Sequence, residues 1–249
     1  MKNIASITTL TLVAAAAMAD AAPAVAPASA WTQSGNLAIS SNYIWRGVSQ
    51  NANTVAISGG YDVAHTSGLS AGAWLSSAGD GYNSSFSTEL DLYANYGFKV
   101  SNIDLSVGYI AYVYQANSAA NFSEVNVSAT YAGVTAKISK EITNGANSNT
   151  PSTTGEGFTN FGYYYELGYT YSIPAVKGLD LGLHYGWADV TGSSNKAEDY
   201  SVSLTYPVAG FTATAAYSNT PGSAAVYSNA DASSVINGGL YSISLKKTF

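Results

Sequence analysis

Apolar and polar side chains alternate through most of the chain after residue 30. Residues 86–98 show this most clearly, with Leu90 and Leu92 on one face and Glu89 and Asp91 on the other. A period of two is that of a β-strand, whereas a helix would repeat every 3.6 residues. The pattern therefore predicts an all-β chain, with one strand of about 13 residues where about 5–6 is usual in globular proteins.

The same alternation predicts about 12 strands. They span 36–46, 54–64, 69–77, 86–98, 103–115, 122–132, 134–142, 159–172, 179–188, 199–206, 211–218 and 238–249. Short turns follow every second strand, and longer polar loops such as 143–158 and 219–237 follow the others. A soluble sandwich has no reason to place all its long loops at one end. Bacterial outer-membrane barrels, by contrast, combine short periplasmic turns, longer extracellular loops and an even strand number. We therefore predict a transmembrane antiparallel β-barrel.

The first 30 residues have the features of a secretory signal peptide followed by an Ala/Pro-rich leader. Lys2 is positively charged, residues 4–17 are apolar, and small residues allow cleavage after Ala19 or after Ala30. The apolar run is shorter than the roughly 20 residues that a membrane-spanning helix needs. We expect export, removal of this leader, and a single outer-membrane barrel domain formed by residues 31–249.

The charge composition narrows the possible partners and cofactors. Only 10% of residues are charged, and 15 acids against 9 bases give a net charge of −6. This balance offers no basic stripe for phosphates, so we expect no nucleic-acid partner. The chain has no cysteine and only two histidines, His65 in a predicted turn and His184 on an inward face. We expect no metal, no cofactor and no catalytic residue, and we interpret His184 as structural or pore-lining.

Aromatic residues gather near both ends of the predicted strands, on the apolar face. Rings of this kind at the two membrane interfaces are a feature of outer-membrane barrels. The predicted girdle residues are Tyr43, Trp45, Tyr96, Phe98, Tyr163, Trp187 and Phe249. We therefore expect the apolar face to contact outer-membrane lipid.

The opposite face would line the lumen of such a barrel. The predicted pore-lining residues are Arg46, Asp62, Glu89, Asp91, Asp104, Glu124, Lys137, Glu166, Asp180 and His184. Acids outnumber bases among them, and rings of carboxylates favour cations. Twelve strands lie between the about 8 whose interior side chains can fill and the about 16–18 that leave an open channel. The sequence thus predicts a narrow, cation-preferring pore, unless the inward acids simply pair with Arg46, Lys137 and Lys246.

Three N-terminal stretches resemble successive motifs of the TorF porin family of bacterial outer-membrane proteins: "SNYIWRGVSQ" (41–50), "ISGGYDVAHTSGLSAGAWLSS" (57–77) and "STELDLYANYGF" (87–98). The last strand, "YSISLKKTF" (241–249), resembles the C-terminal signature that the bacterial barrel-assembly machinery recognises, with Phe249 at its end. The resemblance implies a porin of the bacterial outer membrane. It also implies passive diffusion of small hydrophilic solutes or ions.

Two other classes of function remain open at this point. The first is a structural or surface-binding outer-membrane barrel whose loops 143–158 and 219–237 bind a partner. The second is a secreted soluble β-sandwich or lectin. Conductance separates a porin from the first class, and heat-dependent migration in detergent gels separates a membrane barrel from the second.

Overall fold

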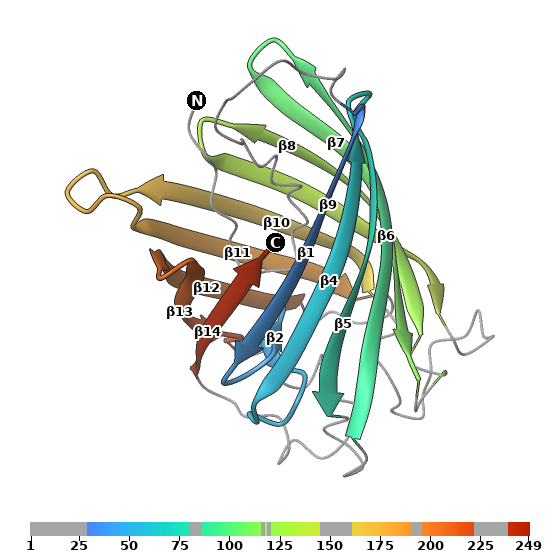
Figure 1. Ribbon diagram of the computed structural model, residues 1–249. Coiled ribbons are helices and arrows are strands. Elements are labelled where there is room, and N and C mark those ends of the chain that lie inside the picture. The colour runs from blue at the N-terminus through green and yellow to red at the C-terminus, as the bar shows by residue number, and fades with distance from the viewer. Residues whose placement is uncertain are drawn as a thin grey trace.

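The computed structural model of the chain is a closed antiparallel barrel of 12 strands (Figure 1). The structure describes residues 29–79, 86–115, 118, 121–144, 161–190, 196–221 and 239–249. The predicted leader, apart from its last two residues, and most of the predicted loops 143–158 and 219–237 lie outside this part of the chain. Within the described part, no helix is long and apolar enough to cross a membrane.

Each barrel strand pairs antiparallel with both of its neighbours. The strands are β1 (Trp31–Ser40), β4 (Ala56–His65), β5 (Leu69–Gly79), β6 (Phe86–Val100), β7 (Ile103–Tyr114), β8 (Phe122–Tyr131), β9 (Val134–Asn144), β10 (Phe161–Ser172), β11 (Asp180–Val190), β12 (Lys196–Val208), β13 (Phe211–Asn219) and β14 (Leu240–Thr248). The barrel closes where β1 pairs with β14 on one side and β4 on the other, so that Ile39 lies opposite both Leu245 and Ile57. Closure gives each barrel strand a partner on both sides, so the barrel lacks the open edges of a flat sheet.

The predicted fold class is confirmed. The largest disagreement concerns the first strand, because the predicted span 36–46 extends well past the observed end of β1 at Ser40. Two short strands, β2 (Ile44–Trp45) and β3 (Val48–Ser49), follow β1 and form a separate two-stranded sheet. This hairpin between β1 and β4 is the feature that the sequence pattern concealed.

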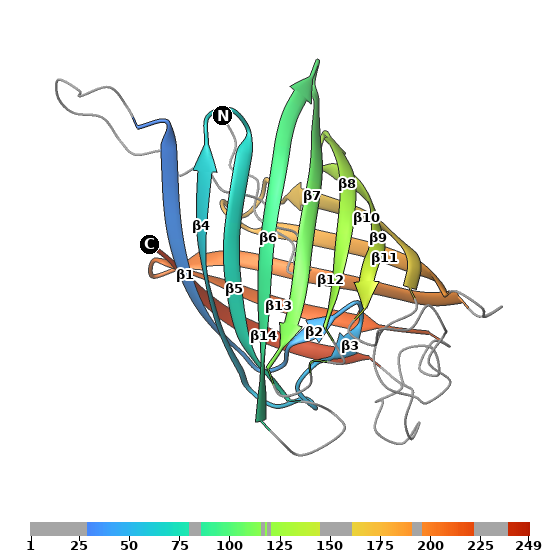
Figure 2. The same ribbon diagram turned by 90° about the vertical axis from the view of Figure 1, so that its right-hand side faces the viewer.

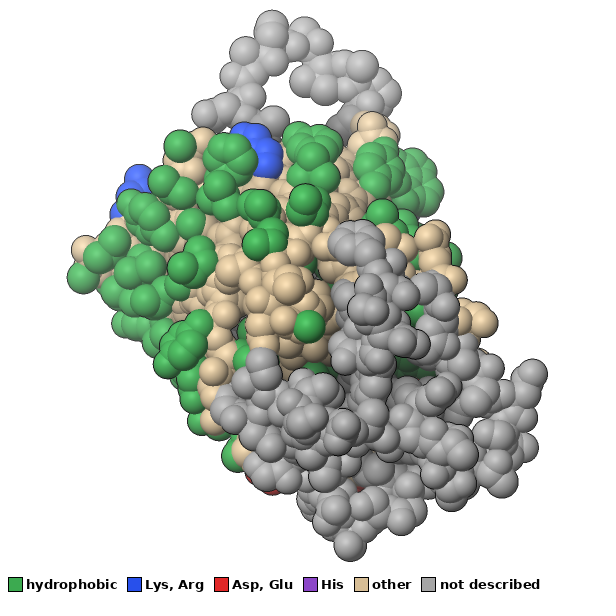
Figure 3. Space-filling model, turned by 90° about the horizontal axis from the view of Figure 1, so that it is seen from below, with side chains coloured by type: hydrophobic (Ala, Val, Ile, Leu, Met, Phe, Trp, Pro, Cys, Tyr) green, Lys and Arg blue, Asp and Glu red, His purple; other side chains and the backbone are tan. Residues whose placement is uncertain are grey.

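Side chains alternate between the outer surface and the lumen along each barrel strand. On β6, the Leu92 side chain is 47% exposed, whereas the adjacent Asp91 is 0% exposed. In the view of Figure 3, hydrophobic side chains cover much of the outer wall and hardly any acidic side chain is visible. The barrel therefore has an apolar outside and a polar inside. This arrangement is typical of barrels whose outer surface contacts lipid.

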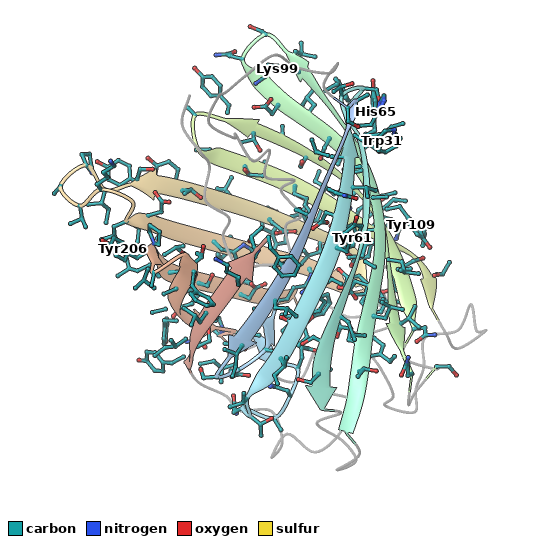
Figure 4. The ribbon with its side chains drawn as sticks, in the orientation of Figure 1. Trp31, Tyr61, His65, Lys99, Tyr109 and Tyr206 are labelled. Atoms are coloured by element: carbon teal, nitrogen blue, oxygen red, sulfur yellow. The ribbon has the colours of Figure 1, made fainter. Side chains whose placement is uncertain are left out.

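The short connections gather at one end of the barrel, which we call the short-turn end. Two of them are Ala132–Gly133 and Ala209–Gly210, in which both residues have positive φ angles. Paired positive φ angles match the two-residue turns that fit the twist of a β-hairpin. Trp31 and His65 lie side by side at this end, with ring centroids 4.6 Å apart (Figure 4). The opposite end, from which β1 leads into the hairpin, is called the long-loop end.

Most predicted girdle residues lie on the outer surface. The side chains of Tyr96, Phe98, Tyr163 and Phe249 are exposed there. Trp187 also lies on the outer face, where it stacks on Tyr165 with ring centroids 4.9 Å apart. Their contact with lipid remains a prediction. Tyr43 and Trp45 are placed differently and belong to the site described next.

Candidate functional site

The β2–β3 hairpin folds into the barrel lumen near the long-loop end (Figures 1 and 2). Ile44 and Trp45 pair with Ser49 and Val48 around a two-residue turn. The turn residues Arg46 and Gly47 have φ angles of 47° and 76°, which resemble those of the Ala–Gly turns at the other end. An arginine with a positive φ is uncommon because its Cβ is crowded there. The two-residue turn requires these positive angles, and it places the Arg46 side chain at the tip of the hairpin.

The segment around the hairpin is tied together by its own polar side chains. The Tyr43 amide donates to the Asn51 Oδ1 atom at 3.0 Å, and the Gln50 amide donates to the Tyr43 carbonyl at 2.7 Å. The Asn42 side-chain amide donates to Asn53 Oδ1 at 2.6 Å. These bonds connect the two ends of the segment, so the hairpin enters the lumen as one cross-linked unit.

Trp45 is buried against the lumen wall, and Tyr43 is partly buried beside it. Trp45 is 9% exposed, and its ring lies 5.9 Å from that of Tyr112 and 6.0 Å from that of Phe122. The Tyr43 hydroxyl donates to Glu89 Oε1 at 2.7 Å. The prediction that Tyr43 and Trp45 belong to a lipid-facing girdle is therefore wrong. Its physical reason is that the chain leaves the wall after Ser40, and the continuing alternation belongs to a hairpin inside the barrel.

Arg46 holds the tip of the hairpin to the wall. Its Nη2 atom donates to both carboxylate oxygens of Glu124 on β8, at 2.9 and 3.0 Å. Its guanidinium lies 3.8 Å from the ring centroid of Tyr164 on β10 and 4.2 Å from that of Trp45. Arginine is suited to this place because its planar group can stack and pair with a carboxylate at once. Arg46 and Glu124 are 6% and 3% exposed, so this is a buried ion pair.

A second polar cluster lies where the hairpin reaches the far wall. The Tyr164 hydroxyl donates to Asp199 Oδ2 at 2.8 Å, and His184 Nε2 lies 2.9 Å from Asp199 Oδ1. Gly186 on β11 makes this possible, because a Cβ atom there would clash with the Tyr164 hydroxyl. Gly47 at the hairpin tip has the same constraint, since a Cβ would meet the Asp199 Cβ at 2.9 Å. The hairpin thus spans the lumen from β1 and β4 to β8, β10 and β12.

The remaining predicted pore-lining residues divide into lumen and rim. Lys137 and Glu166 pair across β9 and β10 at 2.7 Å, and Asp62 accepts a hydrogen bond from the Tyr93 hydroxyl at 2.7 Å. Asp104 lies at the short-turn rim instead, 53% exposed and paired with Lys99. Asp180 begins β11 at the same rim and is partly exposed. Asp104 and Asp180 thus lie at the rim and not along the lumen wall, and a role of either in lining a pore remains a prediction.

A recess lies in the lumen on the short-turn side of the hairpin. The recess is open to solvent. Polar and charged residues make up six of its ten lining residues, and the other four are Tyr93, Tyr109, Ile110 and Tyr112; the six are Asn95, Ser106, Glu124, Asn126, Ser128 and Lys137. Among the residues that the structure describes, no group of three or more His, Cys, Asp and Glu side chains is arranged to hold a metal ion. The lumen therefore combines a polar recess with a hairpin across its long-loop end.

These features define a closed, outwardly apolar β-barrel with a hairpin inside its lumen. The chain belongs to the family described as "Bacterial protein of unknown function (Gcw_chp)", whose model matches residues 24–249. No curated protein matches the chain significantly.

Two solved structures with a similar fold are those of the KdgM porin. The first has a TM-score of 0.54 at 11% sequence identity, and the match covers 87% of this chain and 99% of the porin. The second is "KdgM porin in complex with disordered oligogalacturonate", with a TM-score of 0.53 at 10% identity, covering 88% of this chain and 99% of the porin. At these identities the likeness is one of fold.

Proposed function

We propose that this chain is an outer-membrane porin through which small hydrophilic solutes or ions diffuse passively, with a preference for cations. The observation that carries the proposal is the contrast between the two faces of a closed barrel. The outside presents large apolar residues such as Leu92 and Val107, whereas the inside presents Ser106, Ser128 and Asn126 around a recess. Small polar side chains on an enclosed surface suit water and dissolved solutes.

The location and the partners follow from the same arrangement. An apolar outer surface on a closed barrel is suited to outer-membrane lipid, with exposed rings such as Tyr96 and Tyr163 at the interfaces. Phe249 directly follows β14 and its side chain is exposed, and we propose that the barrel-assembly machinery recognises this segment. A cleaved leader within residues 1–30 would direct export. The resemblance to the TorF porin family supports this assignment.

The proposed cation preference rests on the charges inside the lumen. Arg46 and Lys137 each pair with a glutamate. Among the described side chains, Asp62, Glu89 and Asp91 have no basic partner. The acidic excess therefore persists after the bases are paired, and it favours cations over anions. For this reason we do not extend to this chain the anionic oligogalacturonate named for the KdgM porin.

A structural or surface-binding barrel is the second candidate, and one observation favours it. The hairpin crosses the lumen and buries Trp45 and Arg46 against the opposite wall. A barrel whose lumen is closed in this way would act as a structural or surface-binding protein and would pass no ions. Its loops would then be the functional surface.

Planar-bilayer recording with ion substitution tests the proposal. Purified barrels are inserted into a bilayer that separates two concentrations of KCl, and the reversal potential is measured. The proposal expects single-channel steps and a reversal potential of the sign set by K⁺. The absence of conductance would favour the second candidate, and a reversal potential set by Cl⁻ would contradict the cation preference.

A further inference from the structure

The recess in the lumen lies against three rows of inward-facing residues. The rows cross β6, β7 and β8, which are neighbours in the barrel wall (Figure 2). From the hairpin toward the short-turn end they are Tyr93–Ile110–Glu124, Asn95–Gly108–Asn126 and Gly97–Ser106–Ser128. One apolar border, one row of amides and one row of hydroxyls thus meet at the same place.

The two amides of the middle row lean toward each other over a glycine. A Cβ atom on Gly108 would clash with Asn95 Oδ1 and would lie 2.9 Å from Asn126 Oδ1. Both asparagines are only partly buried, and neither side chain hydrogen-bonds to another residue in the part of the chain that the structure describes. Each amide has donors and an acceptor. Gly108 therefore keeps open a position at which two free amides can reach one molecule.

The charged groups that border the recess are already paired. Glu124 accepts hydrogen bonds from Arg46 at 2.9 and 3.0 Å, and Lys137 pairs with Glu166 at 2.7 Å. A charged solute would lose water in the recess without gaining a free opposite charge, which is unfavourable. The arrangement therefore favours a neutral solute with several hydrogen-bonding groups.

The row beside the hairpin adds an apolar border that is fixed in place. Tyr93 and Ile110 belong to the cluster that packs around Trp45. Binding pockets commonly combine such apolar surface with a few polar groups that orient the ligand. A saccharide ring matches this combination, because its hydroxyls both donate and accept hydrogen bonds and its faces carry C–H groups.

We propose that the recess is a binding subsite for a neutral monosaccharide ring. Its hydroxyls hydrogen-bond to Asn95 and Asn126, and its C–H groups contact Tyr93 and Ile110. The inference rests on the proposed porin and names a class of solute for it. Binding is weak, with a Kd of about 10⁻³–10⁻² M, because a few hydrogen bonds contribute modestly and a diffusing solute must also leave.

Saturation-transfer-difference NMR on the barrel, purified in a detergent without a sugar headgroup, is the direct test. D-Glucose, D-galactose and D-mannose are titrated separately, and at least one should show saturable transfer. D-Glucuronate adds a carboxylate to the glucose ring and should bind more weakly than glucose, because the lysine at the recess is already paired.

Three variants locate the site. Asn95→Ala and Asn126→Ala should each weaken sugar binding about tenfold, because each removes an amide that donates and accepts. Gly108→Ala keeps both amides but places a methyl group between them, and it should also weaken binding. Asn36→Ala is the matched control, since this inward asparagine lies on β1 opposite Gly60, outside the residues that line the recess. It should bind as wild type does.

Folding is checked for each variant by heat-dependent migration in detergent gels, and Gly108→Ala replaces any asparagine variant that does not fold. The inference is overturned if none of the three sugars shows saturable transfer, or if the folded variants of the amide row all bind as wild type does. Glucuronate that binds as tightly as glucose would also overturn it. A barrel that binds sugar but passes no current contradicts only the proposed porin, and a barrel that conducts but binds no sugar contradicts only this subsite.

Discussion

The two halves of the lumen are built from different kinds of side chain. The long-loop half contains the hairpin and is packed with rings and charges, such as Trp45, Arg46 and Tyr164. The short-turn half is lined by small polar residues such as Ser106 and Ser128, whose hydroxyls lie 2.8 Å apart. The same strands form the wall of both halves. Strand number therefore does not by itself determine how far side chains fill this lumen.

The turns of the two halves teach a related lesson. Ala132–Gly133 joins β8 to β9 at the short-turn end, and Arg46–Gly47 forms the tip of the hairpin in the lumen. Both turns have two positive φ angles, but one places a methyl group outside the barrel and the other places a guanidinium inside it. The same type of turn therefore only connects two strands at the short-turn end, whereas in the lumen it positions the arginine that anchors the hairpin.

Removing the hairpin should have the largest effect on the difference between the long-loop half and the short-turn half of the lumen. Replacing residues 43–50 by an equally long Gly/Ser segment removes the rings of Tyr43 and Trp45 from the lumen. We expect the single-channel conductance in KCl to rise several-fold, because the long-loop half becomes as open as the other half. A Lys99→Gln/Asp104→Asn variant, changed only at the rim, should conduct as wild type does. Equal conductance with and without the hairpin would show that it does not limit flow.

Arg46→Ala should weaken the anchor. It leaves the buried Glu124 without its partner, which typically costs about 3–5 kcal/mol of stability. We expect a lower free energy of unfolding in denaturant titrations and, in bilayers, a stronger cation preference. Arg46→Lys is the control, since it keeps the charge but loses the planar group that stacks on Tyr164 and Trp45. Its unfolding free energy should fall between those of wild type and Arg46→Ala. An unchanged unfolding free energy in Arg46→Ala would contradict the anchor.

Gly186→Ala tests the packing at the far wall. The added methyl group clashes with the Tyr164 hydroxyl and should separate it from Asp199. Overpacking of this kind costs about 1–3 kcal/mol. Gly97→Ala is a matched control on β6, because the nearest atoms would be 3.9 Å from its methyl group. We expect denaturant unfolding to separate the two variants, and equal stability would argue against the tight packing.

The smallest effect is expected in the open half. Lys137→Gln removes the base that pairs with Glu166 and leaves one more uncompensated acid beside the recess. The reversal potential in a KCl gradient should move slightly toward that of K⁺, by less than in Arg46→Ala, because the wider half controls selectivity less. Lys99→Gln should have no effect, since that exposed pair lies at the rim. A shift toward Cl⁻ in Lys137→Gln would be the opposite of the expected result.

The sequence predicted the barrel because a two-residue period with apolar outward positions is a local property of each strand. The predicted strand 86–98 compares with Phe86–Val100 in the structure. The same rule failed at the first strand, since Tyr43 and Trp45 continue the spacing of apolar residues past Ser40, although the chain leaves the wall there. The signal that could have revealed the hairpin is Arg46–Gly47 between two short pairs of residues, with glycine at the second turn position.

The sequence allowed us to predict that inward bases pair with inward acids, but not which residues pair. The expectation that inward bases pair with inward acids holds for Arg46 and Lys137, whereas Lys246 lies exposed at the short-turn end. Which acid each base meets depends on strand register and on the hairpin, and neither is a local property of the sequence. For the same reason the burial of Asp91 beside Glu89 could not be foreseen.

The most direct test of the central claim uses the absence of cysteine from the chain. A Ser128→Cys barrel, inserted in one orientation in a bilayer, is treated with a bulky water-soluble thiol reagent from either side while its current is recorded. We predict rapid loss of current when the reagent is added at the short-turn side, because Ser128 lines the open recess. We predict much slower loss from the long-loop side, because the hairpin lies in the way. Equal rates from both sides, or no reaction from either, would contradict a pore that is narrowed by its own hairpin.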